Sequence, residues 1–504
     1  MEEIKYSKYQ INFFDKVQNT NNSILCIAAP GAGKSFVLKK SMELLNPNID
    51  KCFVAFNKSI CEDMKSKVTH IRNLTVQTLH STGFKSLINI YKSKLDNYKY
   101  RKFLKDSIYM LSSQITIDMK DEDINGFINR TLKLLDFARL DLASSEKEIE
   151  MLAISHDLIL EFDEAAVVLK LMNWGVDNPK IVDFADMIYI PVIKNLPVLQ
   201  YSIVYLDEAQ DASKASIELF LKMKKENGRV IIASDPYQNI YFFQSASKDS
   251  FEKLKQLPNI EICPLSICYR CANNVIKKAN EIFGAEREIF ARDNANEGIV
   301  EDLYSLNKEM ILKDKDTMFL ARTNLPLVSL CMKLLSNGIK AFMEGRDLGK
   351  NLISLINKTK KIEIIDIQDS LNHELYKLGM NLSSKLKITF EEAKSENTYI
   401  SLEDKINCIS SLSFGCKNKY ELIAQIEKIF NGEEKGIRLS TVFKAKGLEA
   451  STVFILKPDQ FPFKRACKTP ESEYSEKCAQ FVAYTRSINN LYFVNCKISD
   501  INLN

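Results

Sequence analysis

Short apolar runs alternate with amphipathic segments of helical period in two parts of the chain. In the first part the apolar runs lie at 23–27, 52–56 and 74–76, and they return at 202–206 and 229–233. Runs of this length, separated by helical patterns such as 59–68, are typical of buried strands joined by helices. The alternation predicts a parallel sheet with helices packed on its faces.

Two long stretches carry the helical period without strand-like runs. Within residues 86–180, one set of side chains has heptad-like spacing: Phe127, Thr131, Leu134, Leu135 and Ala138. Residues 346–435 are rich in lysine, glutamate, asparagine and serine, and strand-like runs resume at 437–441 and 452–455. The predicted fold class is therefore α/β, with two parallel-sheet domains that each contain a mainly helical insertion.

These changes of pattern also predict the domain organisation. The first core domain comprises 1–85 and 181–264 around an insertion at 86–180, and the second comprises 265–345 and 436–504 around an insertion at 346–435. A chain of 504 residues has room for such a plan.

Composition is that of an ordinary globular protein, with 45% hydrophobic and 27% charged residues. The net charge is only +4, so we expect any nucleic-acid surface to be local.

No apolar run is long enough to cross a membrane, and the first residues lack the pattern of a secretion signal. The 12 cysteines are scattered, and their one C-x-x-C pair, Cys268 and Cys271, lacks the further ligands of a metal site. We expect reduced thiols, no membrane partner and a cytoplasmic location.

A glycine-rich segment follows the first apolar run and precedes a helical pattern. Its residues are Ala29, Pro30, Gly31, Ala32, Gly33, Lys34 and Ser35. Glycines let backbone N–H groups close around phosphate oxygens, the lysine reaches the outer phosphates, and the hydroxyl suits Mg²⁺. The segment predicts a phosphate-binding loop for a nucleoside triphosphate; the alternative is a glycine turn that matches by accident.

Adjacent carboxylates end the apolar run 202–206. Asp207 lies where a partner for Mg²⁺ is needed, and Glu208 lies where a base can polarise a water that attacks the γ-phosphate. Such a pair at a strand end can also be a solvated turn, but Gln210 and Asp211 follow it here. The segment predicts hydrolysis of the nucleotide, with Ser35 and Asp207 at the metal.

Further blocks follow one another along both α/β parts. In order they are Gln10, Phe56-Asn57, Thr78 to Ser81, Asp183 to Met187, Ser234 to Phe243, Tyr269-Arg270, Ala321 to Asn324, Thr441 to Glu449 and Phe481 to Arg486. Together with the glycine-rich loop and the carboxylates, this ordered set resembles the superfamily 1 DNA helicases of the UvrD/Rep/PcrA type. The resemblance covers both α/β parts and implies that each core domain has the RecA-like fold.

The resemblance implies a nucleotide site to which both core domains contribute. The implied catalytic residues are Lys34, Asp207, Glu208, Gln238, Arg270 and Arg486. Arg486 would be an arginine finger and Gln238 would sense the γ-phosphate. Gln10 would read adenine, Tyr269 would stack on it, and Gly447 and Glu449 would complete the nucleotide contacts. The implied cofactors are ATP and Mg²⁺.

The resemblance also implies contacts to single-stranded DNA. The implied contact residues are Phe56, Asn57, His80, Tyr241, Phe243, Arg322 and Thr441. Aromatic rings among them would stack on bases, although singly each residue is also an ordinary core aromatic, cap or surface charge. Four positions depart from the family pattern. Gln244 stands where the family has arginine, Ser245 where it has glycine, Phe443 where it has histidine and Phe481 where it has tyrosine.

The function implied by the resemblance is an ATP-dependent DNA helicase or translocase that moves 3′ to 5′ on single-stranded DNA. Its expected partners are single-stranded DNA and duplex junctions, with a nuclease or a replication or repair protein as candidate partner. One alternative is a DNA-stimulated ATPase motor subunit of a nuclease, repair or antiviral defence complex. Another is a nucleotide-gated scaffold without hydrolysis, which the presence of Glu208, Arg270 and Arg486 argues against.

Overall fold

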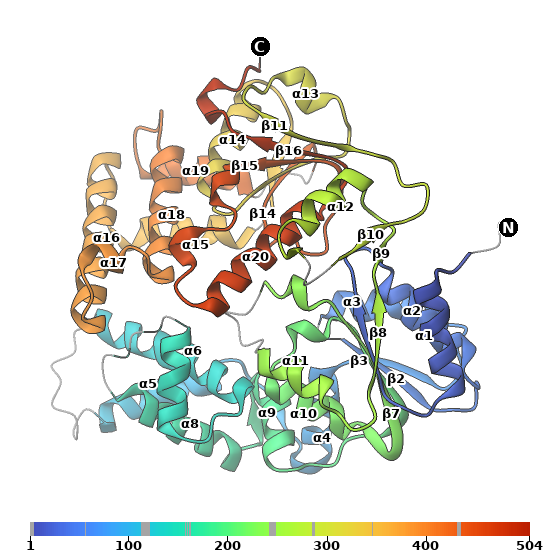
Figure 1. The fold of residues 1–504 in the computed structure, drawn as a ribbon. Coiled ribbons are helices and arrows are strands. Elements are labelled where there is room, and N and C mark those ends of the chain that lie inside the picture. Colours follow the sequence, from blue (N-terminus) through green and yellow to red (C-terminus); the bar gives the residue numbers. More distant parts are fainter. Residues whose placement is uncertain are drawn as a thin grey trace. The chain divides into compact units, whose positions relative to one another are not determined.

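The chain folds into two compact units, Met1–Ile267 and Cys268–Asn504. The computed structural model describes residues 5–55, 57–111, 121–156, 158, 160, 163–240, 248–284, 288–344, 346–430 and 435–503 (Figure 1). Among these residues, no helix is long and apolar enough to cross a membrane.

The first unit is built on a sheet of six parallel strands in the order β3-β2-β6-β7-β1-β8. The strands are β1 (Ile24–Ala28), β2 (Lys51–Ala55), β3 (Leu74–Thr78), β6 (Tyr201–Leu206), β7 (Lys224–Ser234) and β8 (Glu261–Leu265). The apolar runs predicted as strands are confirmed. β7 begins earlier than its apolar run because its first residues are polar and partly exposed, which hides them from a hydrophobic pattern.

Helices cover this sheet, and the strand side chains between them are buried. The helices next to it are α1 (Lys8–Asn19), α2 (Lys34–Leu44), α3 (Lys58–Lys67), α4 (Leu79–Tyr91), α9 (Asp186–Ile193), α10 (Lys214–Lys222) and α11 (Lys248–Lys255). All five residues of β2 are buried, as a strand between two covered faces requires. Each fully buried aliphatic side chain contributes roughly 1.5–3 kcal/mol, so the sheet is a rigid base for the loops at its edges.

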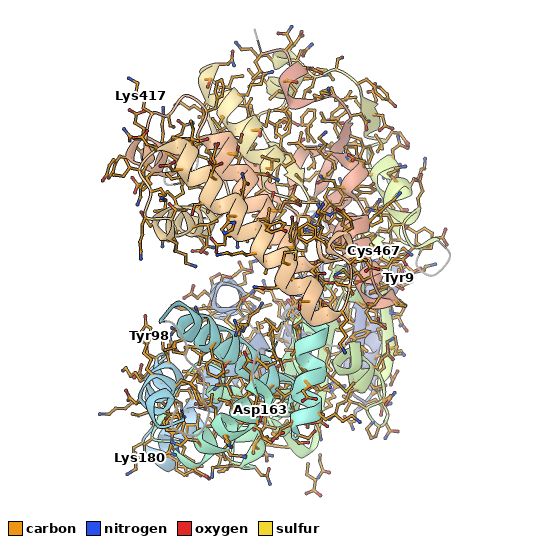
Figure 2. All side chains as sticks on the ribbon, turned by 90° about the vertical axis from the view of Figure 1, so that its left-hand side faces the viewer. Tyr9, Tyr98, Asp163, Lys180, Lys417 and Cys467 are labelled. Atoms are coloured by element: carbon orange, nitrogen blue, oxygen red, sulfur yellow. The ribbon has the colours of Figure 1, made fainter. Side chains whose placement is uncertain are left out.

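A helical cluster lies between β3 and β6 in the sequence. It contains α5 (Lys99–Leu111), α6 (Asp121–Asp141), α7 (Glu146–Ser155) and α8 (Glu164–Asp177), with the short parallel pair β4 (Lys94–Leu95) and β5 (Ile181–Val182). The heptad-like set predicted from the sequence lies on α6, and all of its members are buried. Tyr98, three positions after β4, and Lys180, just before β5, are exposed (Figure 2).

The second unit also contains six parallel strands, in the order β11-β16-β15-β12-β14-β13. They are β11 (Ile299–Leu303), β12 (Thr317–Ala321), β13 (Ala341–Met343), β14 (Ile437–Thr441), β15 (Ala450–Leu456) and β16 (Ser487–Val494), and a separate pair is formed by β9 (Ile267–Cys268) and β10 (Phe290–Ala291). Two all-parallel sheets with helices confirm the predicted α/β class with RecA-like domains.

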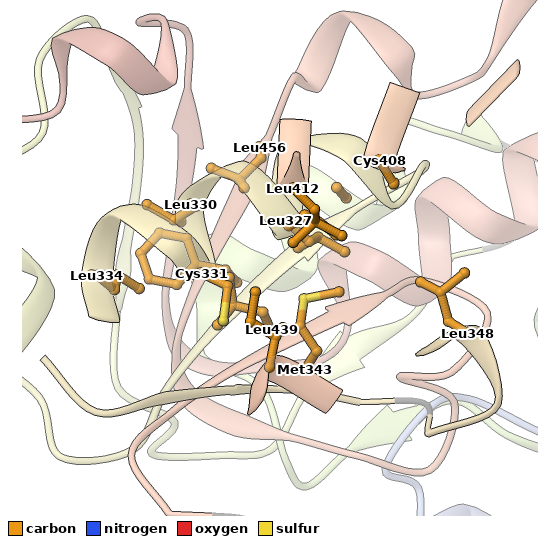
Figure 3. Close-up of a cluster of buried hydrophobic side chains, with 14 of the residues drawn as sticks. Leu327, Leu330, Cys331, Leu334, Met343, Leu348, Cys408, Leu412, Leu439 and Leu456 are labelled. Atoms are coloured by element: carbon orange, nitrogen blue, oxygen red, sulfur yellow. The ribbon is translucent and has the colours of Figure 1, made fainter. Parts of the chain in front are cut away.

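The helices of the second unit are α12 (Asn273–Asn280), α13 (Lys308–Leu312), α14 (Leu325–Ser336), α15 (Arg346–Lys358), α16 (Ile364–Leu386), α17 (Phe390–Ala393), α18 (Asn397–Leu412), α19 (Lys419–Phe430) and α20 (Pro470–Tyr484). Those that share one buried core with its sheet are α13, α14, α15, α16, α18 and α19. Figure 3 shows Leu327 and Leu330 of α14 with Leu412 of α18 and Leu439 of β14 in a single buried cluster. The helices between β13 and β14 are therefore fixed to the sheet through α14.

Candidate active site

Three polar segments follow the carboxyl ends of neighbouring strands in the first sheet. β1 continues into residues 29–35, β6 into Asp207 and Glu208, and β7 into Asp235. Because β7 pairs with both β1 and β6 and all three are parallel, their carboxyl ends meet at one edge of the sheet. The structure therefore brings the glycine-rich loop and the carboxylates together.

The loop 29–35 has the backbone of an anion site. Gly31 and Gly33 have φ angles of 63° and 81°, in the left-handed region that a side chain would strain. The N–H of Ala29 donates to the carbonyl of Leu265 at 2.8 Å, which fixes the loop to β8. Since α2 begins at Lys34, the unpaired N–H groups of its first turn and the positive end of its dipole are available to a phosphate. Three residues of the loop have buried side chains: Ala29, Pro30 and Ala32.

Two contacts join the loop to the carboxylates. The ammonium of Lys34 lies 2.8 Å from Oε2 of Glu208, and the hydroxyl of Ser35 donates to Oδ2 of Asp207 at 2.9 Å. Burial opposes the charge on Lys34, but Glu208, Asp235 and Asp207 together raise its pKa above the usual value. Burial and the neighbouring charge of Glu208 raise the pKa of Asp207 from 3.8 to about 6, while Lys34 and Ser35 lower it. Lys34 thus stays charged where phosphate charge would be held.

Glu208 is held in an unusual conformation. Its φ of 54° and ψ of 42° are left-handed, which costs of order 1–3 kcal/mol for a residue with a side chain. The amide of Gln210 donates to the same carboxylate oxygen, Oε2, that pairs with Lys34. Strain that the surrounding structure enforces at a charged residue is typical of a functional position.

A hydrogen-bonded chain continues from Gln210 to the end of β7. The amide oxygen of Gln210 accepts from the N–H of Asp235 at 2.9 Å and from the hydroxyl of Ser234 at 3.2 Å. The amide of Gln238 donates to Oδ2 of Asp235 at 2.6 Å. Gln238 is therefore connected to Glu208 through two buried residues, Asp235 and Gln210.

Gln10 lies at the start of α1. Its amide oxygen accepts from the N–H of Ser7 at 3.0 Å, and its own N–H donates to the Ser7 hydroxyl at 3.3 Å, which forms a capping box. Helix α1 packs on α2, and the ring of Tyr6 lies 6.3 Å from that of Phe36 in the first turn of α2. The structure thus places Gln10 on the helix beside the one that begins at the loop 29–35.

Three sequence blocks meet in the second unit. Nε of Arg270 lies 2.5 Å from Oε2 of Glu449, and a guanidinium nitrogen of Arg486 donates to the carbonyl of Leu448 at 3.1 Å. Nε of Arg486 also donates to the carbonyl of Val482 at 3.1 Å, and the side chain is only 1% exposed. The carbonyls thus hold Arg486 beside the segment that contains Gly447, whose φ is 87°. Tyr269, next to Arg270, is half-buried.

Two residues predicted to contact DNA lie near the carboxyl ends of β2 and β3. Asn57 is exposed before α3, and His80 lies in the first turn of α4 with its ring 3.9 Å from that of Phe184 in a stacked arrangement. Burial lowers the pKa of His80 to about 4, so it is neutral at neutral pH. Phe184 is 55% exposed and offers an aromatic surface beside His80.

Buried charges fix the segment that contains Phe184. Arg139 of α6 donates to Asp183 at 2.8 Å and to Asp186 at 2.7 Å, and Lys99 lies 2.9 Å from Asp186. Burial opposes ionisation of Asp186, but Arg139 and Lys99 hold its pKa below the usual value. The helical cluster is thereby joined to α9 by an ionic network out of water.

Arg322 is engaged inside the second unit. Its Nε donates to Oε2 of Glu476 at 2.9 Å, and its guanidinium lies over the rings of Phe443 and Phe463 at 4.5 Å and 5.2 Å. These contacts hold Arg322 against the segment that begins at Thr441, which ends β14 and is half-buried. The departure at Phe443 therefore provides a surface for the arginine.

Several predicted DNA contacts lie outside the described residues. These are Phe56, Tyr241 and Phe243, together with the departures Gln244 and Ser245. Phe481, the remaining departure, is buried and packs edge-on to Phe283 at 5.6 Å.

The described part of the chain contains no group of three or more histidine, cysteine or acidic side chains that could hold a metal ion. Ser35 and Asp207 nevertheless present a hydroxyl and a carboxylate oxygen 2.9 Å apart. In nucleotide sites, Mg²⁺ binds only a few oxygen ligands from the protein, and the phosphates supply the rest. The donor set thus fits Mg²⁺ bound together with a nucleotide.

Comparison with known proteins agrees with this geometry. Residues 12–259 match the family model of the UvrD/REP helicase N-terminal domain. The chain is similar to the ATP-dependent DNA helicase Rep of Buchnera aphidicola subsp. Acyrthosiphon pisum, at 24% identity over 62% of this chain and 54% of that protein. It is also similar to the ATP-dependent DNA helicase PcrA of Staphylococcus epidermidis, at 21% identity over 95% of this chain and 82% of that protein. The chain belongs to the UvrD type of superfamily 1 helicases.

For this UvrD-type chain the family match includes the loop 29–35 and the carboxylates at 207–208. The chain spans about half the length of the first Rep relatives, 54% and 45%.

Sequence reasoning gave no role to two residues that the structure places at these sites. Asp235 follows an apolar strand just as Asp207 does, and that signal could have identified it. Glu476 pairs with Arg322 across 154 positions, and no local pattern in the sequence indicates this contact.

Proposed function

We propose that this protein is an ATP-dependent DNA helicase or translocase that moves 3′ to 5′ on single-stranded DNA. The observation that carries the proposal is the group of Lys34, Ser35, Asp207 and Glu208 at one edge of the first sheet. The names of the similar Rep and PcrA proteins support ATP and DNA as the substrates.

Hydrolysis follows from the chemistry of this group. The backbone of the loop 29–35 and Lys34 hold the phosphates, and Ser35 with Asp207 would hold Mg²⁺, which neutralises phosphate charge when bound. Glu208 orients and polarises the attacking water. Its strained backbone and the bond from Gln210 keep the carboxylate in place before the nucleotide arrives.

In this proposal two arginines take part in hydrolysis, as the resemblance to the family implies. Arg486 acts as the finger that stabilises the transferred phosphoryl group, and Arg270 contacts the γ-phosphate, with Tyr269 on the adenine. In the present arrangement Arg270 is paired with Glu449, so nucleotide binding would exchange a carboxylate partner for a phosphate partner. A guanidinium suits both because its planar donors match either oxyanion.

Coupling to DNA is proposed to run through the chain from Glu208 to Gln238. Gln238 is three positions before Tyr241 and five before Phe243, the residues proposed to stack on bases. A shift of Gln238 on binding of DNA would be transmitted through Asp235 and Gln210 to the carboxylate that orients water. Stimulation of hydrolysis by DNA is the expected result.

The experiment is steady-state release of phosphate from ATP with and without single-stranded DNA. We expect a several-fold rise with DNA and a loss of both rates in Glu208→Gln, while Glu62→Gln, an exposed glutamate on α3, keeps both. Absence of ATP turnover with any DNA, or normal turnover in Glu208→Gln, would overturn the proposal.

Direction and unwinding are tested with tailed duplexes. A duplex with a 3′ single-stranded tail should be unwound, and one with a 5′ tail should not. DNA-stimulated hydrolysis without unwinding of either duplex would favour the motor-subunit alternative.

A further inference from the structure

Two cysteines lie side by side in the turn that begins the second unit. Cys268 ends β9, and Cys271 lies just before α12. The N–H of Cys271 donates to Sγ of Cys268 at 3.3 Å, and the thiol of Cys271 donates to the carbonyl of Thr485 at 3.6 Å. Both thiols are reduced and almost fully buried. The backbone of Cys271 is therefore in direct contact with the sulfur of Cys268.

The surroundings of Cys268 favour its thiolate. The thiol of Cys271, the N–H groups of Cys271 and Arg270, and the charge of Arg270 lower the pKa of Cys268 to about 7, against the effect of burial. Burial instead raises the pKa of Cys52 and Cys331 to about 12. Because the thiolate is the nucleophile, Cys268 is expected to react first.

We propose that Cys268 and Cys271 are a reversible oxidation site that hydrogen peroxide converts to a disulfide. The Cys268 sulfur attacks the peroxide and takes one oxygen, which gives a sulfenic acid and water after proton transfer. The Cys271 sulfur then forms the S–S bond and displaces the oxygen as a second water. Two thiols and one peroxide thus give one disulfide and two waters, and a dithiol reductant reverses the change.

A water-sized oxidant can reach the two thiols when the structure around them opens locally. Cys268 lies in the pair β9–β10, which has two residues in each strand, and its carbonyl accepts from the N–H of Arg292 at 3.0 Å. Elements with so few hydrogen bonds open at a small fraction of the cost of global unfolding.

The disulfide would change the turn that contains the proposed nucleotide contacts. Tyr269 and Arg270 are the two residues between the cysteines, so a bond across them alters the direction of both side chains. It also removes the thiol of Cys271 from the carbonyl next to Arg486. We expect oxidation to lower DNA-stimulated ATP turnover, a consequence that rests on the function proposed above.

The chemical test maps the bond on the full chain. The reduced protein is treated with hydrogen peroxide, blocked with a light alkylating reagent, reduced, and labelled with a heavy one before peptide mass spectrometry. We expect Cys268 and Cys271 to take the heavy label together while Cys52 and Cys331 take the light one. Oxidation of other cysteines while this pair stays reduced would overturn the proposal.

Variants separate the two steps. In Cys271→Ser, peroxide should leave a sulfenic acid on Cys268 that dimedone traps, and the disulfide should be absent. Cys467→Ser removes a half-buried cysteine elsewhere in the unit (Figure 2) and should leave the disulfide unchanged. Failure of dimedone to label Cys268 in Cys271→Ser would contradict the order of the steps.

Activity gives the second readout. We expect about tenfold lower DNA-stimulated turnover after oxidation, with recovery in dithiothreitol and no loss in Cys271→Ser before peroxide is added. A mapped disulfide with unchanged turnover would overturn the inhibitory effect. Absence of turnover in the reduced protein would instead overturn the proposed function, and the mapping would still decide the oxidation site.

Discussion

Replacement of Asp207 by asparagine is expected to stabilise the nucleotide-free protein while it removes a proposed metal ligand. Asp207 is 1% exposed, and its charge lies close to that of Glu208. Asparagine has the same size. Its oxygen can accept from the N–H of Glu208, as Asp207 does at 2.9 Å, and its amide can donate to Ser35. The substitution therefore removes the charge and keeps the hydrogen bonds.

The magnitude follows from the pKa of Asp207. Folding raises this pKa from 3.8 to about 6. The folded state therefore binds the proton more tightly than the unfolded state, and wild-type stability falls as pH rises from about 4 to about 6. At about 1.4 kcal/mol per pKa unit, ionised Asp207 costs on the order of 3 kcal/mol above pH 7 and roughly half as much at pH 5. Asp207→Asn should recover about these amounts.

Urea unfolding at pH 5 and pH 8, without nucleotide or Mg²⁺, measures the effect. The one tryptophan, Trp174, lies on α8 in the same unit, so its fluorescence reports unfolding of that unit. A control is Asp63→Asn on α3, whose exposed carboxylate pairs with Lys67 and should change stability by less than about 0.5 kcal/mol. Equal stability of wild type and Asp207→Asn at pH 8, or a gain that is the same at both pH values, would refute the reasoning.

Five further substitutions test other contacts. Lys34→Ala should weaken ATP binding at least about tenfold, whereas Glu208→Gln should bind ATP and not hydrolyse it; equal affinities in a fluorescent-nucleotide titration would contradict these roles. Gln210→Ala removes the bond that fixes Glu208 and should lower turnover by about 10- to 100-fold with little change in ATP affinity, so a change in affinity alone would count against a positioning role. In Arg486→Lys, the ammonium group cannot make both bonds to backbone carbonyls or present the paired donors of a guanidinium to a phosphoryl group. Phosphate release should fall by about 10³–10⁵-fold in a protein with a native circular dichroism spectrum. Near-normal release would remove Arg486 from the mechanism. Arg139→Met leaves the buried Asp186 and the half-buried Asp183 without their guanidinium and should lower the free energy of unfolding by about 3–5 kcal/mol in the Trp174 assay. An unchanged free energy of unfolding would refute the stabilising role of the network.

Local patterns were sufficient for β1, β2, β3, β6, β7, β14 and β15 and for the first elements of the site. Burial on both faces selects continuous apolar runs, so the strands at 24–28 and 202–206 are visible in the sequence. The loop 29–35 is also local, because two glycines and a following helix create its backbone. Strand β16 was not recognised, since Asn489 and Asn490 interrupt its apolar pattern.

Contacts between distant residues were decided by the tertiary structure. The strand order places β7 between β1 and β6, and this order brings Asp235 at the end of β7 to Gln210, which contacts the carboxylate of Glu208 two positions before it. Packing likewise pairs Arg322 with Glu476 and encloses Arg486 among carbonyls. Hydrophobic period and turn chemistry act over a few residues, so they determine elements and loops. Which polar side chains meet depends on how those elements pack, because a buried charge or amide is stable only beside a partner that the fold supplies.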